Sequence, residues 1–313
     1  MLPKSAIKLF GDELSVPFLL APIGAQGIIH ENGDLASARA AASTGVPFIQ
    51  STQASYSLED ISASMGETPH WFQLYWSADR DVTASLVDRA ESAGYSALVV
   101  TVDTPQLGWR ERDVERGYLP FLNGKGLANY FTDPAFRSKL DQPPEENEQG
   151  AVMQFIETFS DPALTWSDFA WLRSRTDLPI IIKGVLHPED AELAVEHGID
   201  GLIVSNHGGR QVDGAVGAMN VLPAVVERID GRIPVLFDSG VRRGSDVIKA
   251  IALGAEAVLL GRPYVYGLAL GGESGVKAVI ENLRADVDLT LALAGHDTLR
   301  DIDGSILSSP YQP

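Results

Sequence analysis

Eight short apolar segments, spread along almost the whole chain, constrain its fold more than any other feature. Each is bounded by Gly, Pro or polar residues, and each is followed by a segment in which apolar residues recur at helical spacing. The apolar segments are residues 17–22, 47–51, 71–75, 97–102, 179–183, 201–205, 234–238 and 257–261. Amphipathic stretches lie between them and open with Asp, Pro or Ser, as in 81–93, 188–197 and 245–253. Strand and helix therefore alternate along the chain.

The predicted fold is an α/β barrel. Apolar segments without polar alternation are typical of parallel strands covered by helices, and eight strand–helix repeats match a closed (β/α)8 or TIM barrel. An open doubly wound sheet is the competing architecture, but no Gly-x-Gly-x-x-Gly motif follows the first apolar segment. We therefore expect residues 1–313 to form a single barrel domain.

The regular spacing fails once, between the fourth and fifth predicted strands. Residues 106–163 stand where a short connection would be enough, and they include the polar run Pro143–Glu148. A long insertion in a compact domain is typically a functional lid or a disordered excursion. Because Tyr118–Leu122 and Ala128–Phe131 carry aromatic side chains that can pack, we expect a partly ordered lid over the barrel.

The composition excludes several classes of function. Without any Cys, the chain has no disulfide, thiol nucleophile or cysteine metal site. Its formal net charge of -18 disfavours binding to nucleic acid or to anionic membrane surfaces. The longest apolar runs are far shorter than a membrane span, and residues 1–4 do not resemble the start of a secretory signal, so we expect a cytoplasmic protein.

Polar residues collect at the carboxyl ends of the predicted strands, where TIM barrels bind their ligands. Glycines and arginines in the last two loops, Gly240 with Arg242 and Gly261 with Arg262, suit a phosphate group, because glycine lets backbone N–H groups approach and arginine supplies charge and paired donors. A phosphorylated ligand is therefore expected. The alternative is that both arginines are surface residues beside glycine turns.

Lys183 ends a strand of three isoleucines, so its stem is enclosed by apolar side chains while its charge reaches the barrel mouth. Such a lysine either pairs with a carboxylate or stabilises a bound anion. A Schiff-base aldolase would also carry a lysine at this position.

His207 and Arg210 share one loop and are separated by two glycines. Arginine suits two-point capture of a carboxylate, and histidine suits proton abstraction near neutral pH. Asp103, at the end of another strand, can hold the second ring nitrogen of the histidine. A purely structural histidine is the alternative. No metal site is expected, because the strand ends show no clustered carboxylates or paired histidines.

These strings resemble the FMN-dependent α-hydroxy acid oxidase and dehydrogenase family. The most specific are Ser205–Gln211 (SNHGGRQ), Thr101–Pro105 (TVDTP) and Asp238–Gly244 (DSGVRRG), and the resemblance runs from about Leu9 to Leu307. It implies an enzyme that binds FMN and assembles as a tetramer or octamer.

The resemblance also implies roles for individual residues. His207 would be the base, with Asp103 as its partner, while Arg210 and Arg110 would hold the substrate carboxylate and Tyr75 would bind the substrate oxygen. Lys183 would stabilise the electron-rich reduced flavin ring. The remaining FMN contacts implied by the family are Pro22, Ile23 and Gly24 at the ring face, Ser51, Gln73 and Thr101 at its polar edge, Ser205 and Asp238 at the ribityl chain, and Gly240, Arg242, Gly261 and Arg262 at the phosphate.

Within the family the insertion and Gly24 are most similar to the lactate 2-monooxygenase branch. The expected reaction is therefore L-lactate with O2 to acetate, CO2 and water. The alternatives are an oxidase that releases the keto acid and H2O2, a flavin-binding module with little turnover, and a lysine aldolase. Family members carry a further N-terminal segment with a tyrosine that helps to hold the substrate; only about 16 residues precede the first strand here. We therefore expect a less covered barrel bottom, with weaker substrate binding or another tyrosine in that role.

Overall fold

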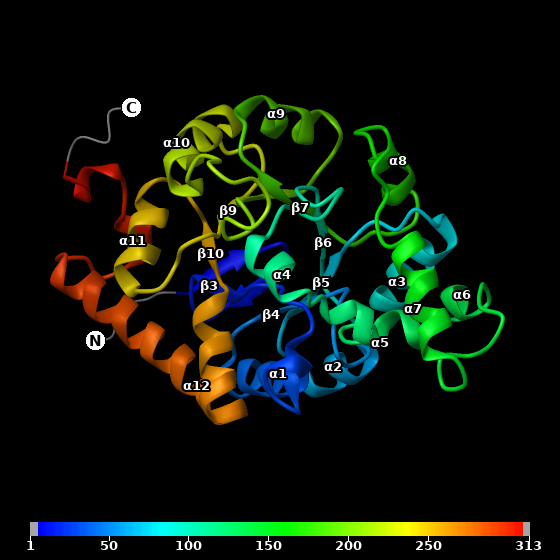
Figure 1. Ribbon diagram of the computed structural model, residues 1–313. Coiled ribbons are helices and arrows are strands. Elements are labelled where there is room, and N and C mark those ends of the chain that lie inside the picture. Colours follow the sequence, from blue (N-terminus) through cyan, green and yellow to red (C-terminus); the bar gives the residue numbers. More distant parts are fainter. Residues whose placement is uncertain (1–5, 309–313) are drawn as a thin grey trace.

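A computed structural model describes residues 6–308 and contains a closed barrel of eight parallel strands (Figure 1). The strands pair in chain order and β10 closes the ring against β3, which confirms the predicted (β/α)8 architecture. Each strand overlaps one of the eight apolar segments. They are β3 (Phe18–Leu20), β4 (Phe48–Ser51), β5 (His70–Leu74), β6 (Leu98–Thr101), β7 (Ile180–Val185), β8 (Gly201–Val204), β9 (Val235–Phe237) and β10 (Ala257–Leu260).

Helices surround the barrel, and the three amphipathic stretches named above are confirmed to within one residue. Side-chain caps fix several starts: the Ser57 side chain accepts a hydrogen bond from the backbone N–H of Asp60, and Asp79 caps the next helix in the same way. No helix within residues 6–308 combines the length and apolarity needed to cross a bilayer. The helices of the ring are α1 (Gly33–Thr44), α2 (Leu58–Met65), α3 (Arg80–Ser92), α8 (Asp168–Arg173), α9 (Pro188–Glu196), α10 (Ala218–Ile229), α11 (Gly244–Ala252) and α12 (Arg262–Leu293), which is broken at Gly271 and Gly272.

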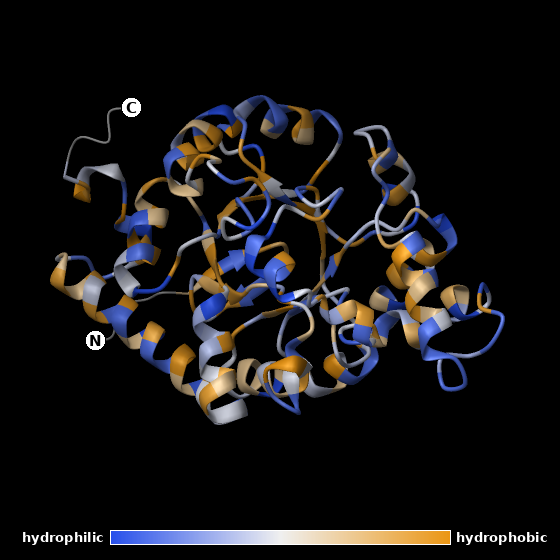
Figure 2. Ribbon diagram, viewed as in Figure 1, coloured by the Kyte–Doolittle hydropathy of each residue, from blue (hydrophilic) through white to orange (hydrophobic). Residues whose placement is uncertain are grey.

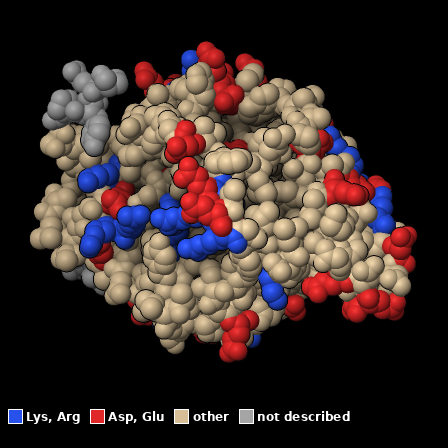
Figure 3. Space-filling model, in the orientation of Figure 1, with Lys and Arg blue, Asp and Glu red and all other residues tan. Residues whose placement is uncertain are grey.

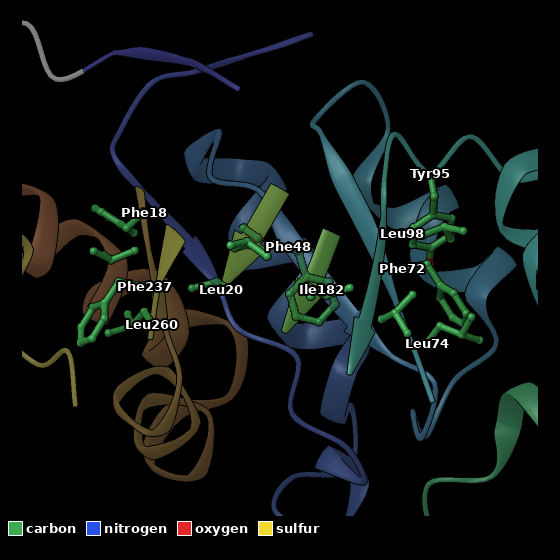
Figure 4. Close-up of a cluster of buried hydrophobic side chains, with 14 of the residues drawn as sticks. Phe18, Leu20, Phe48, Phe72, Leu74, Tyr95, Leu98, Ile182, Phe237 and Leu260 are labelled. Atoms are coloured by element: carbon green, nitrogen blue, oxygen red, sulfur yellow. The ribbon is translucent and has the colours of Figure 1, made fainter. Parts of the chain in front are cut away.

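The core has two layers, separated by the sheet. Successive strand residues point to opposite faces, so in β6 Leu98 and Val100 face the helices while Val99 faces the barrel interior. Figure 4 shows the outer layer, in which side chains such as Phe48 and Phe72 fill the space between strands and helices. Apolar residues accordingly dominate the strands and alternate with polar residues in the helices (Figure 2). This double core holds the strand ends in place.

A short antiparallel hairpin, which the sequence analysis did not anticipate, covers the lower end of the barrel. It consists of β1 (Ile7–Leu9) and β2 (Asp12–Leu14), and the side chains of Leu9 and Leu14 are buried in the interior layer. The ring of Phe10 lies edge-on to Trp71 with 5.5 Å between centroids. This hairpin supplies apolar cover at the lower end, and the expectation that this end is less covered than in family members remains a prediction.

Residues 106–163 contain an exposed part and a packed part. None of residues 106–125 is buried, and α4 (Glu111–Arg116) lies in front of the strands in Figure 1. The following part packs on the barrel through Tyr130, Phe136 and Phe155, whose rings contact one another. The exposed part also contains η2 (Pro120–Asn123), and the packed part consists of α5 (Ala128–Phe131), α6 (Pro134–Arg137) and α7 (Glu148–Thr158). A lid role for the exposed part remains a prediction.

One buried carboxylate makes a testable prediction about stability. Burial raises the pKa of Asp34 from 3.8 to about 7; its Oδ2 accepts a hydrogen bond from the backbone N–H of Ser55, and its Oδ1 has no partner within residues 6–308. Since the folded state holds this proton more tightly than the unfolded state, stability falls as pH rises from about 4 to 7. Asp34→Asn should therefore raise the free energy of unfolding at pH 8 by roughly 1–4 kcal/mol and change it little near pH 4.

Urea unfolding at both pH values measures this effect. Asp177→Asn, at an exposed position, is the control and should leave stability nearly unchanged at both. A destabilised Asp34→Asn at pH 8 would contradict the interpretation.

Candidate active site

The barrel brings the predicted site residues to one end, because all eight strands run parallel and their carboxyl ends form a single rim. Figure 3 shows this end as a surface on which Lys and Arg side chains form a band that runs toward the position of α4, with Asp and Glu beside it. A protein with a large negative charge thus concentrates cations where an anionic ligand would bind.

His207 and Asp103 form the central pair. The Nδ1 atom of His207 lies 2.8 Å from Oδ1 of Asp103, and both side chains are mostly shielded from solvent. Burial raises the pKa of Asp103, but the hydrogen bond from His207 and the charge of Lys183 more than offset burial, so this pKa lies below its usual value. Asp103 is therefore an anion at neutral pH and can stabilise a protonated imidazole.

The loop that carries His207 has an unusual backbone held by serine hydroxyls. His207 has a φ of 56°, in the left-handed region, and its N–H donates to Oγ of Ser205 at 3.0 Å. The N–H groups of Asn206 and Gly208 both donate to Oγ of Ser239, at 3.1 and 3.0 Å. Two serines, one from each of two neighbouring strand ends, thus fix the position of the imidazole.

Lys183 is a buried cation, with 4% of its surface exposed. Its Nζ donates to Oγ of Ser205 at 3.1 Å and lies 3.3 Å from Oδ2 of Asp238. Burial lowers the pKa of Lys183, but the carboxylates of Asp238 and Asp103 outweigh burial and hold the pKa above its usual value. An ammonium group has three N–H donors, so one remains for a ligand after the contacts with Ser205 and Asp238 are made.

A chain of buried hydrogen bonds lines the neighbouring strand ends. Oγ of Ser51 donates to Oε1 of Gln73 at 3.1 Å, and Nε2 of Gln73 donates to Oγ1 of Thr101 at 3.0 Å. Pro22, Ile23 and Gly24 are half-buried beside this chain: a Cβ added to Gly24 would lie 3.4 Å from Oγ of Ser51.

Two arginines lie near each other above the central pair. Arg110 is half-buried, and its Nη2 donates to Oε1 of Gln211 at 3.0 Å. Arg210 is exposed, with its Nη2 3.8 Å from Asp113. Burial and the charge of Arg210 lower the pKa of Arg110. Two guanidinium groups that repel each other in this way favour an anion between them.

Tyr75 lies at the end of β5 among the charged side chains. Burial raises its pKa, and the positive charge of Lys183 offsets part of the rise. The phenol is therefore protonated at neutral pH and available as a hydrogen-bond donor. Tyr75 also lines a cavity of about 370 Å³ whose wall includes Thr101, Thr104 and Gly184.

The glycine–arginine pairs lie in the last two loops, as predicted. A Cβ built on Gly240 would meet no atom within 4 Å, and one on Gly261 would only touch Ile23 and Ala21, at 3.8 and 3.9 Å. Arg242 and Arg262 are exposed, and Nη2 of Arg262 donates to the carbonyl of Gly208 at 2.9 Å. Arg262 therefore already contacts the loop that carries His207.

Comparison with known proteins agrees with this arrangement. Residues 3–309 match the family described as FMN-dependent dehydrogenases. The chain belongs to the FMN-dependent dehydrogenase family. It is 46% identical over 298 residues to an L-lactate oxidase of Lysinibacillus sphaericus, covering 95% of this chain and 76% of that one. It is 43% identical over 305 residues to glycolate oxidase of Spinacia oleracea, covering 97% and 80%. A crystal structure of mandelate oxidase is 39% identical, covers 98% of this chain and 81% of its own, and superimposes with a TM-score of 0.84.

Membership of the FMN-dependent dehydrogenase family confirms the resemblance drawn from the sequence, the assignment as an enzyme and the FMN cofactor. The residues present fit FMN. Two buried polar atoms at the barrel mouth, Nε2 of Gln53 and Oδ2 of Asp103, have no hydrogen-bond partner within residues 6–308. The buried amide and hydroxyl groups beside them suit the polar edge of a flavin, and Lys183 suits a ring that gains negative charge.

Three residues of this FMN-dependent dehydrogenase site were missed in the sequence analysis, although each lies in a quoted motif. Ser239 holds the His207 loop, as described above. Nε2 of Gln211 donates to the carbonyl oxygens of Asp103 and Gln106, at 2.8 and 3.1 Å. Oγ1 of Thr104 donates to Oδ1 of Asp103 at 2.9 Å. Their only signal was adjacency to Asp238, Arg210 and Asp103 in the sequence.

Gly184 generates a prediction for this site. It has a φ of 115°, lies at the irregular end of β7, and a Cβ built there would be 2.6 Å from Cβ of Asp103. Gly184→Ala should therefore displace Asp103 and reduce kcat/KM by at least about tenfold, measured with a 2-hydroxy acid substrate.

Gly94→Ala is the matched control, because Gly94 also has a positive φ, of 87°, but a Cβ there would meet nothing within 4 Å. This variant should lose about 1 kcal/mol of stability with little change in kcat/KM. Equal kinetic effects in the two variants would mean that contact with Asp103 is not what requires Gly184.

Proposed function

We propose that this chain oxidises a small L-2-hydroxy acid, with L-lactate as the first candidate, and passes the electrons to O2. The observation that carries the proposal is the pairing of His207 with an anionic Asp103 at 2.8 Å, next to two arginines. Oxidation of a 2-hydroxy acid requires a base and, next to it, a binding site for the substrate carboxylate. Several relatives are named for this chemistry, including L-lactate oxidases of Lysinibacillus sphaericus and Nostoc.

His207 acts as the base. With a proton on Nδ1 shared with Asp103, the neutral ring keeps a lone pair on Nε2 that can remove a proton from the substrate. The positive charge that then develops on the ring lies beside the carboxylate of Asp103. General bases placed in this way contribute about 10²- to 10⁴-fold to the rate.

Arg110 and Arg210 hold the substrate carboxylate, because paired guanidinium donors match a carboxylate in charge and shape. Arg110 is fixed from behind by Gln211, whereas exposed Arg210 remains free to adjust to the substrate. The phenol of Tyr75, protonated at neutral pH, donates to the oxygen on C2 of the substrate.

FMN, when bound, accepts the two electrons of the oxidation and returns them to O2. Ser51, Gln73 and Thr101 hold its polar edge, Pro22, Ile23 and Gly24 face the ring, and Lys183 offsets the charge that the ring gains. The residues proposed for the ribityl chain and phosphate are Ser205, Asp238, Gly240, Arg242, Gly261 and Arg262.

We propose the oxidase outcome, in which L-lactate and O2 give pyruvate and H2O2. It is supported by the names of the relatives, two of which are L-lactate oxidases. The monooxygenase outcome, acetate with CO2 and water, is the second candidate. It is favoured by the similarity of the insertion and of Gly24 to the lactate 2-monooxygenase branch.

His207→Ala tests the assignment. Anaerobic bleaching of the bound FMN by L-lactate should slow by at least about 100-fold, because the base is missing. His197→Ala, at an exposed histidine on the end of α9, is the control and should bleach at the wild-type rate. Near-normal bleaching in His207→Ala would show that the base is another residue, and a wild-type protein that never bleaches would make the chain a flavin-binding module.

Product analysis of the wild-type reaction under air separates the two outcomes. Pyruvate and H2O2 in equal amounts are expected, and acetate would establish the monooxygenase instead. Assembly as a tetramer or octamer and a cytoplasmic location remain predictions; relatives include forms named as peroxisomal.

A further inference from the structure

We propose that Thr104 is a positioning residue for the base: its hydroxyl orients the carboxylate of Asp103, which in turn keeps the proton of His207 on Nδ1 and leaves Nε2 free to take the substrate proton. This inference rests on the proposed function, because it takes His207 to be the base. It assigns a role to a residue that lies behind the pair and to which no role has yet been given.

The geometry places two donors on one carboxylate oxygen. Thr104 is 5% exposed, and its Oγ1 donates to Oδ1 of Asp103 at 2.9 Å. Nδ1 of His207 lies 2.8 Å from the same oxygen and 3.4 Å from Oγ1 of Thr104. Oδ2 of Asp103, by contrast, has no partner within residues 6–308. The carboxylate is therefore held in one orientation by its interactions on Oδ1.

This arrangement determines the proton on the imidazole. A threonine hydroxyl has one proton, and Thr104 gives it to Asp103, so only acceptor lone pairs of Thr104 face His207. Nδ1 of His207 therefore carries a proton, and Nε2 of the neutral ring keeps the lone pair of a base.

The hydroxyl is well held for this purpose. Pro105 follows Thr104 and restricts its backbone to extended conformations, while the β-branched side chain limits rotation about χ1. Behind Thr104 lies the 370 Å³ cavity, whose lining includes neither Asp103 nor His207. Thr104 therefore lies between the pair and a cavity that Tyr75 also lines.

Two variants separate the hydroxyl from the shape of the side chain. Thr104→Val keeps the β-branch and loses the hydroxyl, whereas Thr104→Ser keeps the hydroxyl and loses the branch. The other charged or titratable groups around Asp103 are Lys183, Arg110 and Tyr75. Tyr75 also interacts with the Thr104 hydroxyl, so Thr104→Val loses that contact as well and Thr104→Ser keeps it. FMN content and thermal unfolding of each holoenzyme show whether the variant is folded.

The measurement is kcat/KM for L-lactate across the pH range. In Thr104→Val the pH-independent maximum of kcat/KM should fall about tenfold, which is the effect of losing one hydrogen bond to a charged group. The fall of kcat/KM on the acid side of the pH profile should move to higher pH, because an Asp103 that has lost one hydrogen-bond donor attracts a protonated His207 more strongly. Thr104→Ser should stay within about twofold of the wild type and keep its pH profile.

Three results would overturn the proposal: wild-type kinetics in Thr104→Val, a loss with an unchanged pH profile, or an equal loss in Thr104→Ser. If Thr104→Val does not retain FMN, Thr104→Ala is measured in its place as the variant without a hydroxyl. His207→Ala is run alongside. Activity retained in His207→Ala would mean that the proposed role of His207 as the base is wrong, whereas an inactive His207→Ala with a wild-type Thr104→Val would mean that only this inference is wrong.

Discussion

The ammonium group of Lys183 is the interaction on which the site depends. A buried charge is costly unless it is paired and hydrogen-bonded, and Lys183 is both: Asp238 lies 3.3 Å away and Ser205 3.1 Å away. These partners come from the ends of β9 and β8, so one cation ties three neighbouring strands together. The same Ser205 hydroxyl accepts the backbone N–H of His207. The group that would balance charge on the flavin thus also helps to set the position of the base.

The loops above the barrel are tied to one another as well as to their own strands. Gln211 connects the loop after β8 with Asp103 and with Arg110, and Arg262 connects the start of α12 with the carbonyl of Gly208. Hydrogen bonds between loops from different strands hold catalytic groups at fixed separations, which is what proton transfer requires. The parts that remain exposed, Arg210 and residues 106–125, are those that a substrate would meet first.

The barrel and most of the site geometry could be predicted from the sequence, because each depends on a local pattern. Apolar runs fixed all eight strands, and the rule that parallel strands end on one rim brought His207 and Asp103 together. The hairpin Ile7–Leu14 was missed because its two strands have three residues each, too few for a pattern. Ser239 and Thr104 were missed for another reason: hydrogen bonds from a hydroxyl group to another loop produce no recognisable pattern in the sequence.

The role proposed for the Lys183 ammonium is to face the bound FMN and stabilise its reduced form. Its most direct test is the midpoint reduction potential of FMN in Lys183→Met compared with wild type, measured by equilibration with a reference dye. We expect a potential lower by at least about 30 mV in Lys183→Met, which corresponds to a tenfold change in the equilibrium constant of a two-electron couple. An unchanged potential in a folded Lys183→Met that retains FMN would contradict it.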